Sequence, residues 1–278
     1  MNFSHELITP NNDLPFKIFE FEGRDGHYYR EKHWHRSIEI FALFEGSLCF
    51  YINDRAYPLK PGEFMLVNSH EIHSIASPEP NHTVVLQMPL TTFANYYTDD
   101  KFIYFSHSAK LQDEKVMALI RDMYETYQEK TLGYELKVQS DFYMLIYLLV
   151  TKYRKTEVNR EELQRSRGLF RLSAVTSYMK ENYMKDLSLE SVAEVFGYSP
   201  TYLSRMFQKY AQTKYKTYLN QIRLEHAYID LMNSDMTIGE IAMRSGFPNS
   251  NALTKEFKAR YGLLPSEFRK KEKDKNLI

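Results

Sequence analysis

The sequence has 278 residues, of which 43% are hydrophobic, and this is enough for two domains with separate cores. Its one cysteine, Cys49, excludes an intrachain disulfide and is typical of a protein in a reducing compartment. The segment Met1–Glu6 lacks the basic start of a signal peptide, and no apolar run reaches the ~18 residues of a membrane span. A soluble, cytoplasmic protein without a membrane partner is therefore expected.

The formal net charge is zero, but the charges are divided unevenly along the chain. Residues 160–278 hold 20 Lys and Arg against 14 Asp and Glu, whereas the preceding residues hold 16 against 22. A basic C-terminal part behind an acidic N-terminal part is expected if only one of them contacts nucleic-acid phosphates.

Residues 1–106 have the pattern of β structure. Short runs rich in aromatic and β-branched residues alternate with turn residues such as Asn53–Asp54 and Lys60–Gly62. The predicted strands are residues 16–21, 38–44, 47–52, 64–67 and 83–88. Several short strands at this spacing predict an antiparallel barrel or jelly roll.

A histidine-rich stretch within this part carries the candidate ligand-binding residues. Alternate residues of an extended strand share a face, so His33, His35 and Glu39 are expected to project together. This spacing, followed by Pro61–Gly62 and by His73, is similar to the cupin signature. In metal-binding cupins these positions, here His33, His35, Glu39 and His73, hold a first-row divalent ion.

The same polar side chains offer a second interpretation. Beside Trp34 they could hydrogen-bond and stack on a carbohydrate, as in apolar pockets with a few polar groups. Because Trp34 alternates with the two histidines, packing on the opposite face is an equal alternative. His70 lies nearer a turn and is a weaker alternative to His73, and the other histidines considered are expected at the surface: His5, His27, His82 and His107.

Two helices are predicted after the β structure, over residues 111–128 and 134–155, with Gly133 breaking the chain between them. The second helix is apolar on more than one face, because Phe142 and Leu145 share one stripe whereas Tyr143 and Tyr147 lie on another. One stripe can cover a small barrel, and the other calls for a partner. A homodimer is the hypothesis, with packing of both stripes inside one chain as the alternative.

The C-terminal part contains the same small unit twice. At an offset of 49 residues, four apolar or glycine positions of the first copy match the second: Leu189 with Ile238, Val192 with Ile241, Ala193 with Ala242 and Gly197 with Gly246. Each copy has a short amphipathic helix, a glycine suited to a tight turn, and a second amphipathic helix, which is a helix-turn-helix. Ser199 and Pro200 are expected to begin one second helix, and Thr237 with Glu240 predicts a capping box.

Each second helix needs only part of its surface for packing. Leu203 and Phe207, like Leu253 and Phe257, form an apolar stripe, and the polar residues between them are free to face a DNA major groove. The predicted DNA-binding residues are Thr201, Ser204, Arg205, Gln208, Ser250, Asn251, Thr254 and Lys255. A helix over residues 215–232, roughly 27 Å long, suits two units about one turn of duplex, ~34 Å, apart.

The C-terminal part resembles the AraC/XylS family of bacterial transcription regulators, in which a long helix joins two helix-turn-helix units. The likeness is carried by residues 189–207, 218–227, 238–247 and 261–269. The DNA-facing positions of that family correspond to Thr201, Ser204, Arg205, Ser250, Asn251, Thr254 and Lys255. Residues 248–251 lack the aromatic that many members carry there, which predicts weaker phosphate contacts.

The resemblance also implies how the rest of the chain works. Sensor domains of this family share the cupin barrel, mostly bind a small molecule such as a sugar without metal, and are followed by helices that pair two subunits. On this basis His33, Trp34, His35, Glu39 and His73 are the predicted effector-binding residues, without a metal or cofactor. Activation of carbohydrate-utilisation genes, with RNA polymerase as a further partner, is the expected outcome.

The sequence therefore predicts an α+β multidomain protein. Its expected parts are a cupin-like barrel over residues 1–106, a dimerising helical hairpin over 107–156, a linker over 157–169 and a DNA-binding domain over 170–272. A ligand-responsive, non-enzymatic regulator of double-stranded DNA is the main hypothesis. The alternatives are a metal-dependent cupin oxygenase or isomerase with a DNA-binding tail, and a constitutive DNA-binding protein with a structural barrel.

Overall fold

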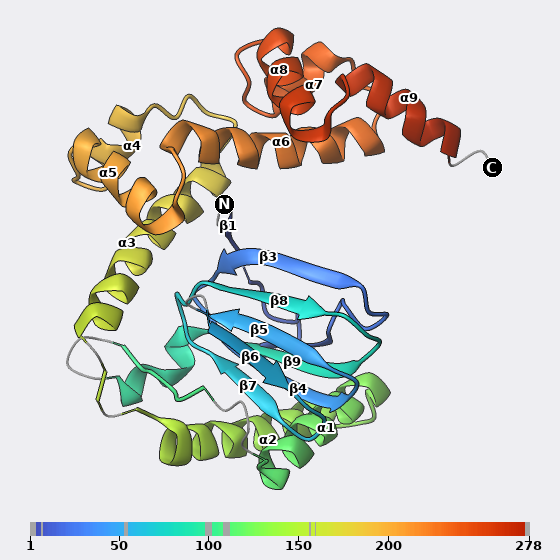
Figure 1. The fold of residues 1–278 in the computed structure, drawn as a ribbon, viewed down its shortest axis with the longest axis vertical. Coiled ribbons are helices and arrows are strands. Elements are labelled where there is room, and N and C mark those ends of the chain that lie inside the picture. Colours follow the sequence, from blue (N-terminus) through green and yellow to red (C-terminus); the bar gives the residue numbers. More distant parts are fainter. Residues whose placement is uncertain are drawn as a thin grey trace. The chain divides into compact units, whose positions relative to one another are not determined.

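The computed structural model describes residues 4–6, 8–52, 55–97, 102–107, 112–155, 157–158 and 160–275, so the predicted Asn53–Asp54 turn lies outside the described residues (Figure 1). The chain divides into two compact units, Met1–Ser173 and Ala174–Ile278, here called the β unit and the helical unit. Among the described residues, no helix is both long and apolar enough to span a membrane.

The β unit is built from two sheets. The five-stranded sheet has the order β1 (Ser4–His5), β3 (Tyr28–Trp34), β8 (His73–Ser77), β5 (Leu48–Ile52) and β6 (Arg55–Leu59). The four-stranded sheet has the order β2 (Lys17–Glu20), β9 (His82–Met88), β4 (Ile38–Glu45) and β7 (Phe64–Val67). All five predicted strand regions contain strands, and the predicted turn at Lys60–Gly62 is present, with Gly62 at a φ of 84°.

The two sheets form a sandwich of the jelly-roll type rather than a closed barrel. Their hydrogen-bonded ladders are separate among the described strands, and β1 pairs with β3 in parallel, so the pairing is not wholly antiparallel. Phe41, Phe50 and Val85 belong to one core cluster drawn from both sheets. The expectation of a barrel was wrong in this respect because strand composition specifies a buried face but not whether edges meet.

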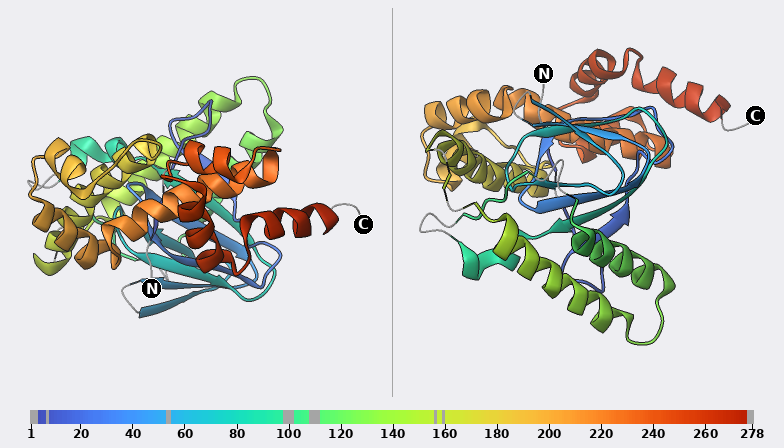
Figure 2. Two further views of the ribbon diagram at one scale, coloured as in Figure 1. Left: turned by 90° about the horizontal axis from the view of Figure 1, so that it is seen from above. Right: turned by 60° about the horizontal axis from the view of Figure 1, so that its bottom comes forward.

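The predicted helical hairpin covers the outer face of the four-stranded sheet. Helix α1 (Glu114–Glu129) and helix α2 (Tyr134–Leu148) lie side by side under the strands, and α2 continues as a π-helical segment, Leu149–Tyr153 (Figure 2). Ile120 and Leu145 share a core with the sheet residue Ile40, and the rings of Phe16 and Phe142 stack at 3.9 Å. The hairpin is thus part of the β unit, while Tyr143 and Tyr147 on its second stripe are 64% and 61% exposed.

The segment expected to be a linker is mostly helical. Helix α3 runs from Arg160 to Asn182 and so covers most of residues 157–169. Leu169 and Leu172, three residues apart, are buried. The polar composition of this segment predicts a linker, but an apolar residue every third or fourth position is sufficient for a packed helix.

The helical unit contains the predicted repeat. Its elements after α3 are α4 (Leu189–Val195), α5 (Pro200–Met206), the π-helical segment Phe207–Ala211, α6 (Tyr215–Asn233), α7 (Ile238–Arg244), α8 (Ser250–Tyr261) and α9 (Pro265–Lys275). The turns between α4 and α5 and between α7 and α8 contain Gly197 and Gly246, whose φ angles of 66° and 80° lie in the left-handed region that favours glycine. The joining helix α6 ends within one residue of its predicted end.

Candidate DNA-binding surface and ligand-binding cluster

The first candidate DNA-binding surface belongs to α5. The Ser199 side chain accepts a hydrogen bond from the Tyr202 backbone N–H, and Pro200 occupies the first turn, so the helix begins as predicted. Leu203 is buried on one side of the helix, and this leaves the other side to solvent. Thr201 and Arg205 are exposed there and Ser204 is half-buried, while Gln208 is exposed in the π-helical segment just beyond α5.

The second surface belongs to α8 and repeats this arrangement. The Asn249 side chain caps the helix by accepting a hydrogen bond from the Ala252 N–H, and Leu253 and Phe257 are buried. Of the polar side chains left over, Asn251 and Lys255 are exposed, and the other two are half-buried: Ser250 and Thr254. The Thr237–Glu240 capping box at the start of α7 is present, with both of its reciprocal hydrogen bonds.

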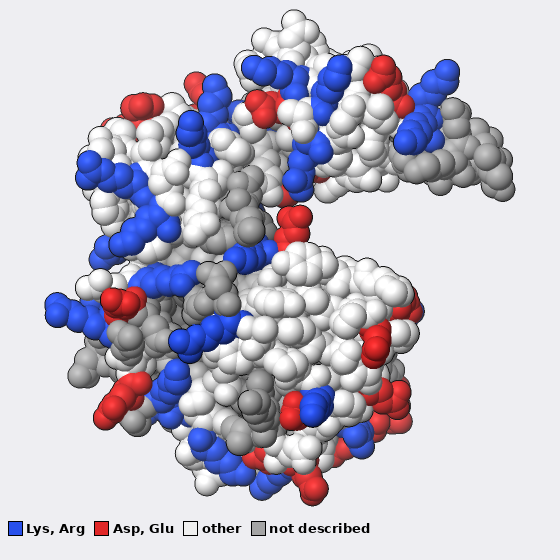
Figure 3. Space-filling model, viewed as in Figure 1, with Lys and Arg blue, Asp and Glu red and all other residues white. Residues whose placement is uncertain are grey.

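The helical unit carries basic side chains on its surface (Figure 3) and a buried arginine in its interior. Basic side chains are distributed over the helical unit on the face drawn in Figure 3. Behind the surfaces, Arg223 of α6 donates hydrogen bonds to the carbonyl groups of Tyr183 and Lys185, at 2.9 and 2.8 Å. Burial lowers the pKa of this guanidinium, which still remains charged at neutral pH. Arg223 therefore fixes the end of α3 against the joining helix.

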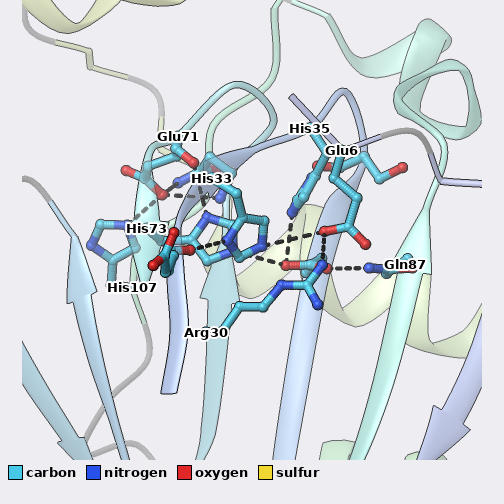
Figure 4. Close-up of polar contacts among 12 residues, drawn as sticks. Glu6, Arg30, His33, His35, Glu71, His73, Gln87 and His107 are labelled. Carbon is cyan, nitrogen blue, oxygen red and sulfur yellow. Dashed lines mark hydrogen bonds and ion pairs between the residues drawn. The ribbon is translucent and has the colours of Figure 1, made fainter. Parts of the chain in front are cut away.

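Two cross-strand pairs of the β unit face one another between the sheets. His33 of β3 is in register with His73 of β8, and Glu39 of β4 is in register with Gln87 of β9. His35 follows β3 and places its Nε2 atom 2.8 Å from Glu39 Oε2, while His73 Nε2 lies 3.2 Å from the same oxygen. We call His33, His35, Glu39 and His73 the histidine–glutamate cluster (Figure 4).

Hydrogen bonds fix the tautomer of each histidine in the cluster. The Nδ1 atoms of His33, His35 and His73 each lie 2.9 Å from a backbone carbonyl oxygen two residues away, those of Glu31, Ser37 and Glu71. A carbonyl only accepts, so each Nδ1 carries the proton and Nε2 is left free to act as a lone-pair donor. All three Nε2 atoms are thus available to the interior of the cluster.

The carboxylate in the cluster is also oriented. The Gln87 side-chain amide donates to Glu39 Oε1, which directs Oε2 to the histidines. Burial by itself raises the pKa of Glu39, but the neighbouring imidazoles of His35 and His73 outweigh burial and hold this pKa well below the ordinary value. Conversely, burial lowers the pKa of His35, and the Glu39 charge raises it overall. Burial holds the pKa of His33 well below its ordinary value.

A small polar cavity adjoins the cluster. Its volume is about 90 Å³, and Glu6, Arg30, His33, Glu39 and Gln87 are among its lining residues. Arg30 is neutralised there by Glu6 at 2.9 Å and by Glu22 at 2.6 Å. The cavity is well below the ~300 Å³ at which pockets for drug-sized ligands begin. It fits a few water molecules or a small group in the conformation observed.

The structure brings four of the five predicted effector-binding residues together, and Trp34 is the exception. Trp34 is fully buried, is not among the residues lining the cavity, and stacks on His5 with ring centroids 5.4 Å apart. Packing on the opposite face, the alternative for this residue, is what the structure shows. His5 itself is buried, contrary to the expectation of a surface residue, because it belongs to the short strand β1.

Sequence patterns did not reveal several residues around the cluster. Glu6 and Gln87 come from segments distant in sequence from the histidines, whereas Arg30 lies on β3 three residues before His33, and all three line the cavity beside the cluster. Gln87 had a weak signal, since a polar residue within the apolar run of residues 83–88 needs a buried partner. His70, considered as an alternative ligand, instead faces helix α3, where its Nε2 lies 3.4 Å from Ser173 Oγ.

The fold and the two sites define a class of protein. A β unit with an interior polar cluster, followed by a doubled helix-turn-helix, is the architecture of two-domain DNA-binding regulators. Comparison with known proteins specifies the family. Residues 18–146 match the model of the AraC-like ligand binding domain, and residues 192–271 match a model described as a helix-turn-helix domain. The chain belongs to the AraC family of transcription regulators.

Individual relatives agree with this assignment. The chain is 41% identical over 106 residues to the uncharacterized HTH-type transcriptional regulator YijO of Escherichia coli, a match that covers 38% of this chain and only 37% of that protein. It is 21% identical over 267 residues to the melibiose operon regulatory protein of Escherichia coli, covering 92% of this chain and 88% of the relative. The crystal structure of ToxT from Vibrio cholerae shares the fold, with a TM-score of 0.53, 14% identity and coverage of 92% and 97%.

Proposed function

We propose that this protein is a ligand-responsive transcription regulator that binds two adjacent major-groove segments through α5 and α8. The observation that carries the proposal is the repeated helix-turn-helix, whose two second helices bury equivalent apolar residues and leave equivalent polar faces exposed. An α-helix fits the major groove, and hydroxyl, amide and cationic side chains are the groups that recognise base edges there.

The residues have different roles in this proposal. Arg205 contacts a guanine, because its guanidinium can donate two hydrogen bonds to one base. Thr201, Ser204, Asn251 and Thr254 add direct or water-mediated contacts, and Lys255 contacts a base or phosphate. Gln208 and Ser250 lie at the ends of the two surfaces and complete them. The names of the relatives as transcriptional regulators support a role in regulation rather than catalysis.

The histidine–glutamate cluster and its cavity are the proposed effector site. The likeness to the melibiose operon regulatory protein makes a carbohydrate the proposed class of effector. The proposed outcome, from the family resemblance alone, is activation of genes together with RNA polymerase. The cavity of about 90 Å³ is smaller than a sugar needs, so this proposal requires the site to open when the effector binds.

Helix α3 offers a route by which such a change reaches the end of the β unit. The His35 carbonyl oxygen accepts a hydrogen bond from the His70 N–H at 2.8 Å, and the His70 ring contacts Phe170 and Ser173 of α3. An effector that displaces His35 therefore acts on the contacts of α3. Exposed Tyr143 and Tyr147 of α2 support a further proposal, that two chains pair through this helix.

Selection from random-sequence duplex DNA tests the function. The purified full chain is expected to enrich one sequence containing two half-sites about one helical turn apart, and to bind it with an affinity that falls steeply with salt. A panel of sugars is then added to the selected complex, and one of them should change the affinity. Enrichment of no sequence would reject specific DNA binding, whereas specific binding that no sugar changes would reject the carbohydrate effector alone.

A further inference from the structure

We infer that the histidine–glutamate cluster binds a divalent first-row transition-metal ion through the Nε2 atoms of His33, His35 and His73 and the carboxylate of Glu39. This inference deepens the proposed function. Binding of the ion does not depend on that function, and only a regulatory effect of the ion rests on it. It departs from the expectation, drawn from family resemblance, that the sensor domain works without metal. Four features of the cluster carry it.

The first feature is the direction of the imidazoles. All three histidines donate Nδ1–H to a backbone carbonyl, which leaves Nε2 deprotonated on the cluster side. Histidines that ligate metals almost always have this arrangement, because a hydrogen bond at one nitrogen fixes the ring and raises the basicity of the other. A fixed tautomer at one histidine is common, but three such histidines whose Nε2 atoms converge indicate that they bind one ion together.

The second feature is the absence of hydrogen bonds inside the cluster. Within the described residues, His35 Nε2, His73 Nε2 and Glu39 Oε2 are buried, and none of these atoms has a partner with hydrogen-bonding geometry. The short Nε2–Oε2 distances of 2.8 and 3.2 Å therefore bring polar atoms together without satisfying them. Unsatisfied polar groups in an interior are costly, and an ion between them would satisfy all three.

The third feature is the spacing of the donor atoms. Ligands ~2.1 Å from an ion and at right angles around it lie ~3.0 Å apart, close to the two distances from Glu39 Oε2. The donor atoms of the three histidines lie within 4.8 Å of one another, so shifts of about 1 Å close the set. His33 makes the largest adjustment, because its Nε2 also lies 3.4 Å from Glu6.

The fourth feature is the surroundings of the donor set. The Gln87 amide orients the Glu39 carboxylate from behind, as outer partners of metal ligands do. The adjoining cavity of about 90 Å³ leaves room for water or for one oxygen group of an effector. Three imidazoles and one carboxylate favour Zn²⁺, Ni²⁺, Co²⁺ or Fe²⁺ over Ca²⁺ or Mg²⁺, which prefer all-oxygen sites.

A buried ion pair between protonated His35 and Glu39 is the competing explanation for the same distances. It requires a hydrogen bond from His35 Nε2, whereas the geometry there does not fit one. It also gives no reason for His33 and His73 to direct free Nε2 atoms to the same place.

Cobalt titration of the full chain tests the metal site. The chain is freed of metal with a chelator, returned to chelator-free buffer and titrated with Co²⁺ while the visible absorption is recorded, and Zn²⁺ then competes. One Co²⁺ per chain is expected, with new ligand-field bands that Zn²⁺ abolishes. Glu39→Gln and His35→Ala should each weaken binding at least about 100-fold, since even outer partners of metal ligands contribute 10–100-fold.

Two further variants keep the test decisive. Gln87→Ala retains all four ligands and should weaken Co²⁺ binding about 10–100-fold, even if a ligand variant fails to fold. His82→Ala is the matched control, because this partly exposed histidine of the β unit pairs with Glu20 and lies outside the cluster. It should bind Co²⁺ like the unchanged chain.

The failure of the metal site is distinguishable from the failure of the proposed function. The metal site is refuted if the unchanged chain takes up neither Co²⁺ nor Zn²⁺. It is also refuted if Glu39→Gln and Gln87→Ala both bind these ions as tightly as the unchanged chain does. Either result holds whatever the chain does with DNA. If one ion binds as expected but no DNA sequence is selected, the metal site stands and the proposed regulatory function is refuted.

Discussion

In the helical unit the candidate DNA-binding side chains lie at the surface of α5 and α8, whereas in the β unit the histidine–glutamate cluster is buried between two sheets. The surface side chains need only a correctly capped helix and a buried stripe beneath them. The buried side chains come together only when one cross-strand pair from each sheet is in register, and backbone carbonyls must also fix the tautomers of the histidines. Recognition on the surface is thus specified locally, and recognition in the interior is specified by the whole sandwich.

A substitution also affects the stability of the two units differently. An exposed polar residue of α5 can be exchanged with little effect on folding, because surface substitutions usually change stability by less than about 0.5 kcal/mol. A residue of the cluster cannot be exchanged in this way, because its buried polar neighbours lie 2.8–3.2 Å away and a substitution changes the balance of charge among them. Four predictions test or refine this difference, beginning with the largest expected effect.

The first prediction tests whether the two units are stabilised separately. Phe142→Ala removes the ring that stacks on Phe16 under the four-stranded sheet and should lower the free energy of unfolding of the β unit by about 3–5 kcal/mol. The transition of the helical unit in a denaturation curve should not move. Phe257→Ala, a buried phenylalanine of the helical unit, is the matched control and should do the reverse. Equal shifts of both transitions by either variant would show one cooperative unit.

The second prediction concerns the equivalent glycines of the repeat. A Cβ at Gly246 would lie 2.4 Å from the Tyr183 carbonyl oxygen and 2.9 Å from Arg223 Nε, whereas a Cβ at Gly197 would meet no atom of the described residues within 4 Å. Gly197→Ala should thus cost only the left-handed backbone strain, roughly 1–2 kcal/mol. Gly246→Ala should cost about 1–3 kcal/mol more, because it also breaks the Arg223 hydrogen bond. Chemical denaturation measures both, and equal losses would contradict the difference in packing.

The third prediction concerns the exposed surface of α5. Arg205→Ala should weaken binding to the selected DNA by about 1–3 kcal/mol, relax the preference at one base and leave thermal stability unchanged. The control is Arg244→Ala on α7, an exposed arginine that pairs with Asp230 outside the two DNA-binding surfaces. Affinities are compared on selected and scrambled duplexes. An equal loss on both would reassign Arg205 to a phosphate contact.

The fourth prediction uses pH to probe the interior of the β unit. Burial, with the nearby charges of Arg36 and His35, lowers the pKa of His70 from its ordinary value of 6.5 to about 3. The unfolded chain therefore binds a proton here that the folded chain does not, and stability should fall as the pH drops below 6.5, by at most ~1.4 kcal/mol per pH unit. His33, whose pKa is also lowered, acts in the same direction. The raised pKa of His35 affects stability only above pH 6.5.

His70→Asn isolates the contribution of His70 in this window. Asparagine tolerates the left-handed backbone of this position, where φ is 62°, and it cannot titrate. Urea denaturation between pH 6.5 and 5 should give a shallower pH dependence in the variant than in the unchanged chain. The difference in slope should persist until the pH approaches 3, where His70 of the folded chain is also protonated, while Glu39 and Glu71, whose pKa values are lowered, steepen both curves alike below pH 4.5. Identical slopes above pH 5 would show that His70 is solvated.

The sequence by itself determined the repeated helix-turn-helix, its caps and its turns. These features depend on interactions within a few residues, such as the Ser199 cap, the Thr237–Glu240 capping box and the left-handed turn at Gly197. They also occur twice at a fixed offset, which makes the pattern hard to mistake. The positions of β2, β4, β5, β7 and β9 and the convergence of His33, His35, Glu39 and His73 were predictable for a related reason, since strand composition, alternation and motif spacing carry them.

Only the tertiary structure decided how these parts are completed. It showed that the two sheets form an open sandwich, that residues 160–169 are helical, and that Trp34 packs on His5 instead of lining the cavity. It also placed Gln87 behind Glu39 and fixed the tautomers of the three histidines. Each of these outcomes depends on contacts between residues far apart in sequence. Periodicity and capping report which face of an element is buried, but not what it is buried against.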